Sequence, residues 1–110
     1  MKKLAQLPED QKTVVIFRKD RSGAFKGMIT AFFPYDIYRT DNYTCTCYVN
    51  PGGHSGADFP YCVTQTVLAK PEEYADLKKE LERIGYILDV KQKMNWKQFD
   101  KAMKEANLGR

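Results

Sequence analysis

Three cysteines and the only histidine lie close together in the middle of the chain, and their side chains could bind a metal ion. Cys45 and Cys47 are two residues apart, and His54 and Cys62 follow across a turn-forming segment. Thiolate and imidazole are usual ligands of Zn²⁺, and four of them complete a closed tetrahedral site. The C-x-C spacing is shorter than that of a usual zinc knuckle, and free cysteine is commonly a small buried apolar residue. We therefore predict core cysteines, with zinc at Cys45, Cys47, His54 and Cys62 as the alternative.

The glycine-rich segment 52–58, which reads Gly-Gly-His-Ser-Gly-Ala-Asp, is the second place where chemistry could occur. The members of a hydrolytic triad normally come from separate elements, whereas His54 and Ser55 are adjacent. The glycines could present backbone N–H groups to an anion, but no P-loop Gly-Lys-Ser/Thr follows them. We predict a tight connection in which Asp58 accepts a hydrogen bond from nearby backbone and His54 lies at the surface. If the chain has a binding site, the candidate residues are Gly53, His54, Asp58 and Tyr48.

Alternating residue patterns predict the strands that would position these side chains. Within residues 43–49 the alternation places Cys45 and Cys47 on one face of a strand and Tyr48 on the other. Pro34 cannot donate to a strand ladder, so we expect it to end the second strand. The predicted strands are residues 13–18, 27–33, 43–49, 61–68 and 86–90, and residues 34–42 and 54–60 are expected outside regular structure.

Two helices are predicted in the second half of the chain. The first begins at Pro71, carries one apolar stripe and ends at Gly85. The second begins at Asn95, where Gln98 completes a capping-box spacing, and Trp96 is expected to anchor this helix on the sheet. The order β-β-β-β-α-β-α predicts an α+β fold, with an antiparallel sheet of four to five strands packed by two helices on one face. Residues 1–11 are predicted as a loose arm, and residues 12–110 as a single domain.

Three stretches of the sequence can be compared with known proteins as motifs. They are Val-Val-Ile-Phe-Arg-Lys at 14–19, Gly-His-Ser-Gly-Ala-Asp-Phe at 53–59, and Ala-Lys-Pro-Glu-Glu-Tyr-Ala-Asp-Leu at 69–77. Together with Cys47-Tyr48 and Ile84-Gly85-Tyr86, they resemble a group of short, uncharacterised proteins of bacterial integrative and conjugative elements and prophages. The resemblance covers residues 13–93. That group carries a glutamine and a tyrosine where this chain has Gly53 and Phe59. The resemblance implies a mobile-element accessory protein and brings no activity with it.

Composition and length indicate where the protein works. No apolar run approaches the roughly 20 residues that a membrane-spanning helix needs, and the N-terminal residues lack the apolar core of a secretory signal. An odd number of cysteines without an export signal favours reduced thiols. We therefore expect a cytoplasmic protein without a membrane partner, either a monomer or a small homo-oligomer.

Basic and aromatic residues raise the question of nucleic-acid binding. Lysines and arginines gather around the first predicted hairpin and toward the last helix, and several tyrosines offer stacking surfaces. The order of elements matches neither the RNA-recognition sheet nor a double-stranded-RNA domain. Lys97, Lys101 and Lys104 also have the spacing of a solvated helix face. We predict a non-enzymatic binding module with a protein or nucleic-acid partner. The alternative is a small metal-binding or hydrolytic protein centred on residues 52–58 and the neighbouring cysteines.

Overall fold

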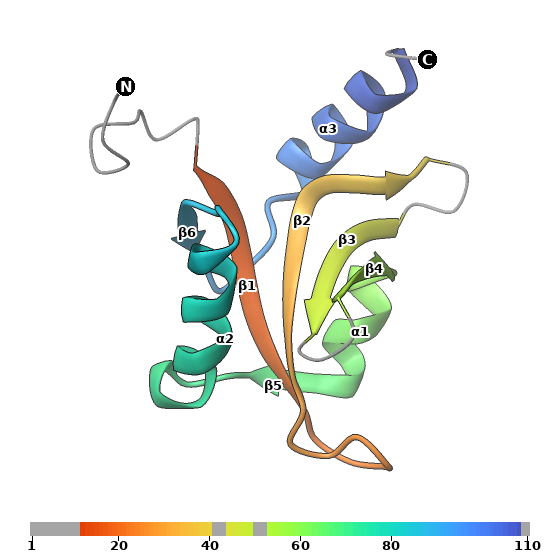
Figure 1. Ribbon diagram of the computed structural model, residues 1–110. Helices are drawn as coiled ribbons and strands as arrows, with labels where there is room; N and C mark the ends of the chain where they lie inside the picture. The colour runs from red at the N-terminus through yellow and green to blue at the C-terminus, as the bar shows by residue number, and fades with distance from the viewer. Residues whose placement is uncertain (1–11, 41–43, 50–52, 109–110) are drawn as a thin grey trace.

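The computed structural model describes residues 12–40, 44–49 and 53–108, so the arm predicted for residues 1–11 lies outside the described chain (Figure 1). The elements are β1 (Thr13–Asp20), β2 (Ile29–Arg39), β3 (Thr44–Val49), β4 (Gly53–Ala57), α1 (Phe59–Gln65), β5 (Thr66–Leu68), α2 (Pro71–Arg83), β6 (Leu88–Val90) and α3 (Trp96–Leu108). The predicted α+β class is confirmed.

A single six-stranded sheet organises the molecule. Five strands pair antiparallel in the order β4-β3-β2-β1-β5, and β6 pairs parallel with β1. The residues of β1 alternate between the two faces, and Val15, Ile16 and Phe17 are all buried. Apolar side chains on both faces are typical of an interior strand, and β1 has partners along both of its edges.

Helix α2 covers one face of the sheet. Its first turn begins at Pro71, and the Glu73 carboxylate accepts a hydrogen bond from the Lys70 backbone N–H at 2.9 Å, which caps the helix. Leu77 and Leu81 then pack on the side chains of β1 and β2. The Tyr74 ring also stacks on Phe17, with their centroids 4.2 Å apart.

The other face is covered by α1, which corrects the prediction of a strand over residues 61–68. Asp58 accepts a hydrogen bond from the Tyr61 backbone N–H at 3.2 Å, and Pro60 lies in the first turn, so the chain is set up for a helix. The Thr66 hydroxyl donates to the Cys62 carbonyl where the helix ends, and only residues 66–68 continue as strand β5. Phe59 packs against Ile16 and the cysteines of β3 on this face.

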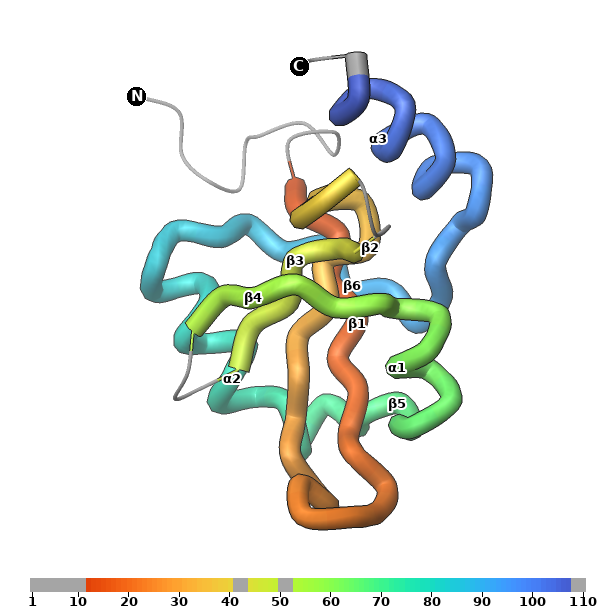
Figure 2. Tube along the Cα trace, turned by 90° about the vertical axis from the view of Figure 1, so that its right-hand side faces the viewer, coloured from red at the N-terminus to blue at the C-terminus, as the bar shows by residue number. Residues whose placement is uncertain are grey.

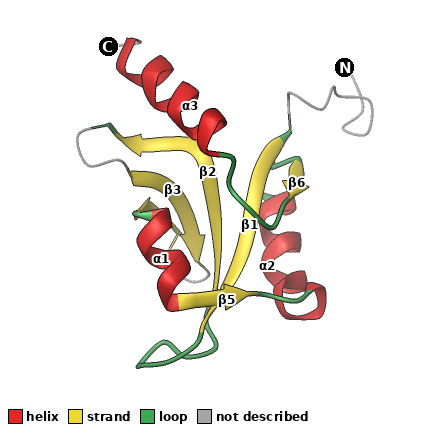
Figure 3. Ribbon diagram, turned by 180° about the vertical axis from the view of Figure 1, so that it is seen from behind, coloured by secondary structure: helices red, strands yellow, loops and turns green. Residues whose placement is uncertain are grey.

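Strand β2 continues through Pro34, although this proline was expected to end it. The register with β3 shifts between Phe33 and Ile37, so the missing N–H of Pro34 falls where the ladder is already interrupted. Beyond this irregularity β2 bends sharply, as Figure 3 shows from behind. Residues 54–57, which were expected outside regular structure, form the edge strand β4 together with Gly53.

Helix α3 lies against the bent end of β2 (Figure 2). Its predicted start is confirmed, because the Asn95 side chain accepts a hydrogen bond from the Gln98 backbone N–H at 3.1 Å. The Asn95 N–H in turn donates to the Tyr35 hydroxyl at 2.6 Å, which ties the start of the helix to β2. Among the described helices, none is long and apolar enough to cross a membrane.

Candidate functional site

The four side chains of the alternative zinc site lie on opposite faces of the sheet. Cys45 and Cys47 point into the core beneath α1, and Cys62 of α1 packs against the same cluster. His54 lies opposite Tyr48 in the β3–β4 register and contacts that ring, so it belongs to the face covered by α2. The four residues therefore do not form one ligand set. In the part of the chain that the structure describes, no group of three or more His, Cys, Asp or Glu side chains is arranged to hold a metal ion.

The cysteines have the character of core residues, as predicted. Cys45 and Cys47 are buried, and Cys62 is half-buried beside them. Burial, reinforced by the neighbouring thiols, raises the pKa of Cys45 to about 12, and burial also raises the pKa of Cys62. Both thiols therefore stay protonated at neutral pH, a state unsuited to nucleophilic attack.

The residues of a hydrolytic arrangement are also separated by the fold. The His54 imidazole is hydrogen-bonded to the Tyr86 hydroxyl, with Nε2 and the oxygen 2.7 Å apart. Ser55 faces the opposite side and lies 3.3 Å from the Cys47 sulfur. Asp58 is occupied as the cap of α1, which confirms its predicted bond to nearby backbone. Because these three side chains point in different directions, they do not make a nucleophile, base and orienting acid.

Near His54, a polar side chain of β3 contacts charged side chains at the end of α2. The Tyr48 hydroxyl donates to the Glu80 carboxylate at 3.3 Å, and burial together with the charge of Glu80 raises the pKa of Tyr48. Arg83 donates two hydrogen bonds to the same carboxylate at 2.9 and 2.8 Å. The bond between Tyr48 and Glu80 joins the helix to the sheet, whereas Arg83 and Glu80 both belong to α2. The two glycines of β4 are needed for different structural reasons, since Gly53 has a positive φ and Gly56 lies directly under the Tyr38 ring.

A concave surface lies on the α1 face of the sheet. Figure 3 shows the elements around it, which are α1, β5 and the segment that leads into α3. We call it the Trp96 groove, and its volume is about 450 Å³. It is lined by Arg18, Phe59, Pro60, Val63, Leu68, Gln92, Lys93, Met94 and Trp96. Most of these side chains are apolar, and the size is within the range of ligand-binding sites.

Several apolar side chains of the Trp96 groove are exposed to solvent. Val63 is 37% exposed, Leu68 40% and Trp96 58%. Trp96 was expected to anchor α3 on the sheet, but its side chain is more than half exposed, and its ring packs edge-on against Phe99 of its own helix. A contiguous group of exposed apolar side chains is typical of an interaction surface. Sequence reasoning missed this site because its residues come from four separated segments and because residues 61–68 were assigned to a strand.

Arg18 is the main charged group of the Trp96 groove, and it is half-buried. Its Nε donates to the Thr66 hydroxyl at 2.6 Å and its Nη2 to the Thr66 carbonyl at 2.9 Å. These acceptors are neutral, and burial lowers the pKa of Arg18. Lys93 adds a second cation, while no carboxylate is found among the described residues that line the groove.

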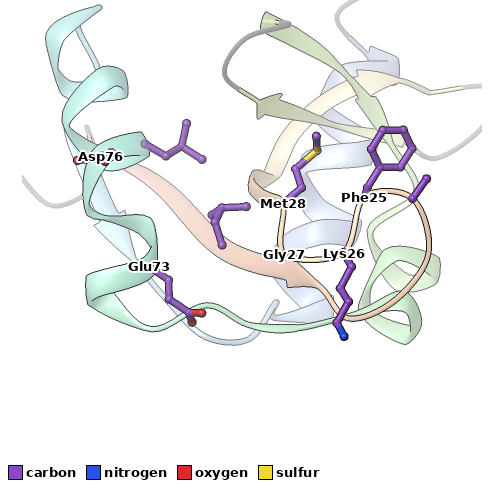
Figure 4. Close-up of a pocket in the computed structure, with 9 residues that line it drawn as sticks. Phe25, Lys26, Gly27, Met28, Glu73 and Asp76 are labelled. Carbon is purple, nitrogen blue, oxygen red and sulfur yellow. The ribbon is translucent and has the colours of Figure 1, made fainter.

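A second concave surface lies between the β1–β2 hairpin and α2, and we call it the hairpin cleft. Its volume is about 520 Å³, and Figure 4 shows Phe25 and Met28 of the hairpin on one side with Glu73 and Asp76 of α2 on the other. Glu73 forms an ion pair with Lys19, so its charge already has a partner. The hairpin cleft is thus more polar than the Trp96 groove, and its lining combines these two carboxylates with the cation Lys26, whereas the charged residues that line the Trp96 groove are cations.

Comparison of the chain with models of protein families, with curated proteins and with solved structures finds no match.

Proposed function

We propose that the protein is a non-enzymatic binding module that holds a segment of a protein partner in the Trp96 groove. The observation that carries this proposal is the exposure of Val63, Leu68 and Trp96 around one concave, mainly apolar surface. Covering these side chains would remove apolar area from water, which is the main favourable term in protein association. A protein partner also fits the accessory role in a mobile element that the sequence resemblance implies.

A protein partner is favoured over a nucleic acid because many of the cations already have partners. Lys19 pairs with Glu73, Lys91 with Asp89, and Lys101 with Glu105. Two of the tyrosines considered for base stacking are engaged in the fold, while Tyr38 and Tyr61 are exposed on separate elements, β2 and α1. Tyr48 is buried, the Tyr35 hydroxyl is bonded to Asn95, and Tyr43 lies outside the described residues. This distribution differs from the continuous basic groove with aromatic platforms that single-strand binders use.

The hydrolytic and metal-binding alternative has less support. Its residues would have to act together, but His54 lies on the face of α2 while Cys45, Cys47 and Cys62 lie on the face of α1. Residues 52–58 and the neighbouring cysteines are therefore not proposed as a catalytic or metal centre.

The test uses Trp96 as a reporter, because it is the only tryptophan in the chain. Short random peptides displayed on phage are selected on the full protein, and the recovered peptides are synthesised and titrated while tryptophan fluorescence is followed. We expect binding that changes the emission of Trp96 and that weakens about tenfold, equal to about 1.4 kcal/mol, in Leu68→Asp.

The matched control is Phe25→Asp, which places the same charge on the exposed tip of the hairpin cleft. This variant should bind the peptides as the unaltered protein does. Thermal melts of both variants verify that each is folded. The proposal is wrong if no recovered peptide distinguishes Leu68→Asp from Phe25→Asp.

A further inference from the structure

From the charges around the Trp96 groove we infer that the segment it binds is acidic as well as apolar, and that an Asp or Glu carboxylate of this segment pairs with Arg18. This inference rests on the proposed function and specifies the chemistry of the partner. Its basis is the position of one cation among neutral atoms at the wall of an apolar groove.

Some N–H donors of the Arg18 guanidinium have no acceptor among the described residues. Of its five N–H groups, Nε and Nη2 donate to Thr66 and weakly to the Val63 carbonyl, whereas Nη1 donates to no described residue. The bonds to Thr66 hold the guanidinium plane in one orientation, so little side-chain freedom would be lost when an anion binds. The structure therefore presents two oriented N–H donors with a full positive charge.

Lys19, the next residue of β1, has the carboxylate partner that Arg18 lacks in the described chain. Strand alternation sends Lys19 to the α2 face, where it pairs with Glu73, and sends Arg18 to the α1 face. A half-buried cation that has only neutral partners has given up part of its hydration without gaining an opposite charge. A carboxylate from outside would supply that charge, and charge-assisted bonds of this kind are stronger than neutral ones.

Lys93 extends the same preference across the groove. Lys93 belongs to the segment before α3, whereas Arg18 belongs to β1. Apolar side chains of α1 and β5 also line the groove. A segment that combines apolar and acidic side chains would match both parts of this surface. A basic segment would bring like charges together and be rejected.

The shape of the groove favours a protein segment over a small apolar acid. Sites for small molecules commonly enclose most of the ligand surface. Here Val63, Leu68 and Trp96 stay partly exposed at the rim and leave the surface open. A longer chain that crosses the rim can cover these residues, whereas a small molecule would leave them in water.

The experiment starts from the groove-dependent peptides of the phage selection. We expect an Asp or Glu at a recurrent position, and replacement of that residue by Asn or Gln should weaken binding about tenfold. In Arg18→Gln most of the preference for the acidic peptide over its amide form should be lost. Arg18→Lys should retain part of the preference, because it keeps the charge but not the planar donors.

Arg21→Gln is the control for general charge effects, since Arg21 lies near the same end of α1 but donates to the Thr64 carbonyl and does not line the groove. It should leave the preference for the acidic peptide unchanged. If Arg18→Gln fails to fold in a thermal melt, Lys93→Gln on the exposed segment is measured instead and should reduce the preference.

The outcomes separate the two proposals. Groove-dependent peptides that lack an acidic residue, or that tolerate its replacement by an amide, would overturn the inference and leave the binding module standing. No groove-dependent peptide at all would overturn both. Displacement of every peptide by decanoate, with no preference among the peptides, would point to a small apolar acid and would also overturn the inference.

Discussion

At the scale of single residues, several side chains are fixed by one close neighbour. Gly56 lies under the ring of Tyr38, and a Cβ atom at this position would overlap the ring atoms. Tyr38 is itself half-exposed, so its ring can be removed without opening the core. The pair links the edge strand β4 to the bent part of β2, two strands that are not neighbours in the sheet.

We predict that Gly56→Ala destabilises the protein by about 1 kcal/mol, because the added methyl group displaces the Tyr38 ring. The melting temperature should fall by about 4–8 °C. In the double variant with Tyr38→Ala the second substitution should restore most of the loss, since nothing then occupies the space above the methyl group. Thermal melts of the two single variants and the double variant measure this. An additive loss in the double variant would show that the ring contact is not the cause.

At the scale of elements, α2 is tied to the sheet by its carboxylates as well as by its apolar stripe. The hydrogen bond from Lys19 lowers the pKa of Glu73, and hydrogen bonds from Arg83 lower the pKa of Glu80. Glu80 also accepts the bond from Tyr48 of β3. The two glutamates therefore connect α2 to β1 and to β3.

The lowered pKa values predict how the helix responds to acid. A carboxylate whose pKa is lower in the folded state stabilises that state above its ordinary pKa, which is 4.5 for glutamate. This stabilisation is lost as the pH falls through the lower folded value. We expect the melting temperature to decrease below pH 4.5 and Glu80→Gln to reduce that decrease. Glu82→Gln, which removes an exposed i,i+4 pair with Lys78, is the control and should leave the acid response nearly unchanged.

The elements also show how far sequence reasoning reaches. The strands around Ile16 and Cys45 were predictable because side chains on each face repeat every second residue. Helix α2 was predictable from its apolar stripe and its proline. Helix α1 was missed because its β-branched residues are typical of strands, and the cap at Asp58 outweighed that preference. The register shift that admits Pro34 into β2 depends on β3 and has no local signal.

The candidate site was harder to predict than the fold. His54 and Asp58 were singled out correctly as surface and turn-forming residues, but their side chains diverge once β4 and α1 are formed. The Trp96 groove depends on Arg18 and Leu68 lying opposite each other in the β1–β5 pair. That juxtaposition of residues far apart in the chain follows from the sheet register, which the sequence alone does not specify.

At the scale of the whole molecule, one sheet separates two apolar cores that share the same strands. Phe17 belongs to the core beneath α2, and Ile16 to the core beneath α1. Because adjacent residues of β1 serve the two cores, neither core can come apart without disturbing the strand that forms the other. We expect the described chain to unfold as one unit.

We predict that Leu81→Ala costs about 2–5 kcal/mol, because Leu81 is fully buried beneath α2. Ile84→Ala, one turn further along the chain, removes a side chain that is 42% exposed and should cost much less. Urea unfolding followed by far-UV circular dichroism and by Trp96 fluorescence should give coincident transitions for Leu81→Ala, although Trp96 lies on the far side of the sheet. Separate transitions would mean that the two cores unfold independently.

The parallel pair between β1 and β6 has a consequence for synthesis on the ribosome. Thr13 pairs with Leu88, so the first described strand completes its hydrogen bonds only after the last one has been made. At about 5–20 residues per second, several seconds of translation pass between the two. During this interval that edge of β1 presents unpaired backbone N–H and C=O groups, and a fragment that ends before β6 would be prone to pair with copies of itself.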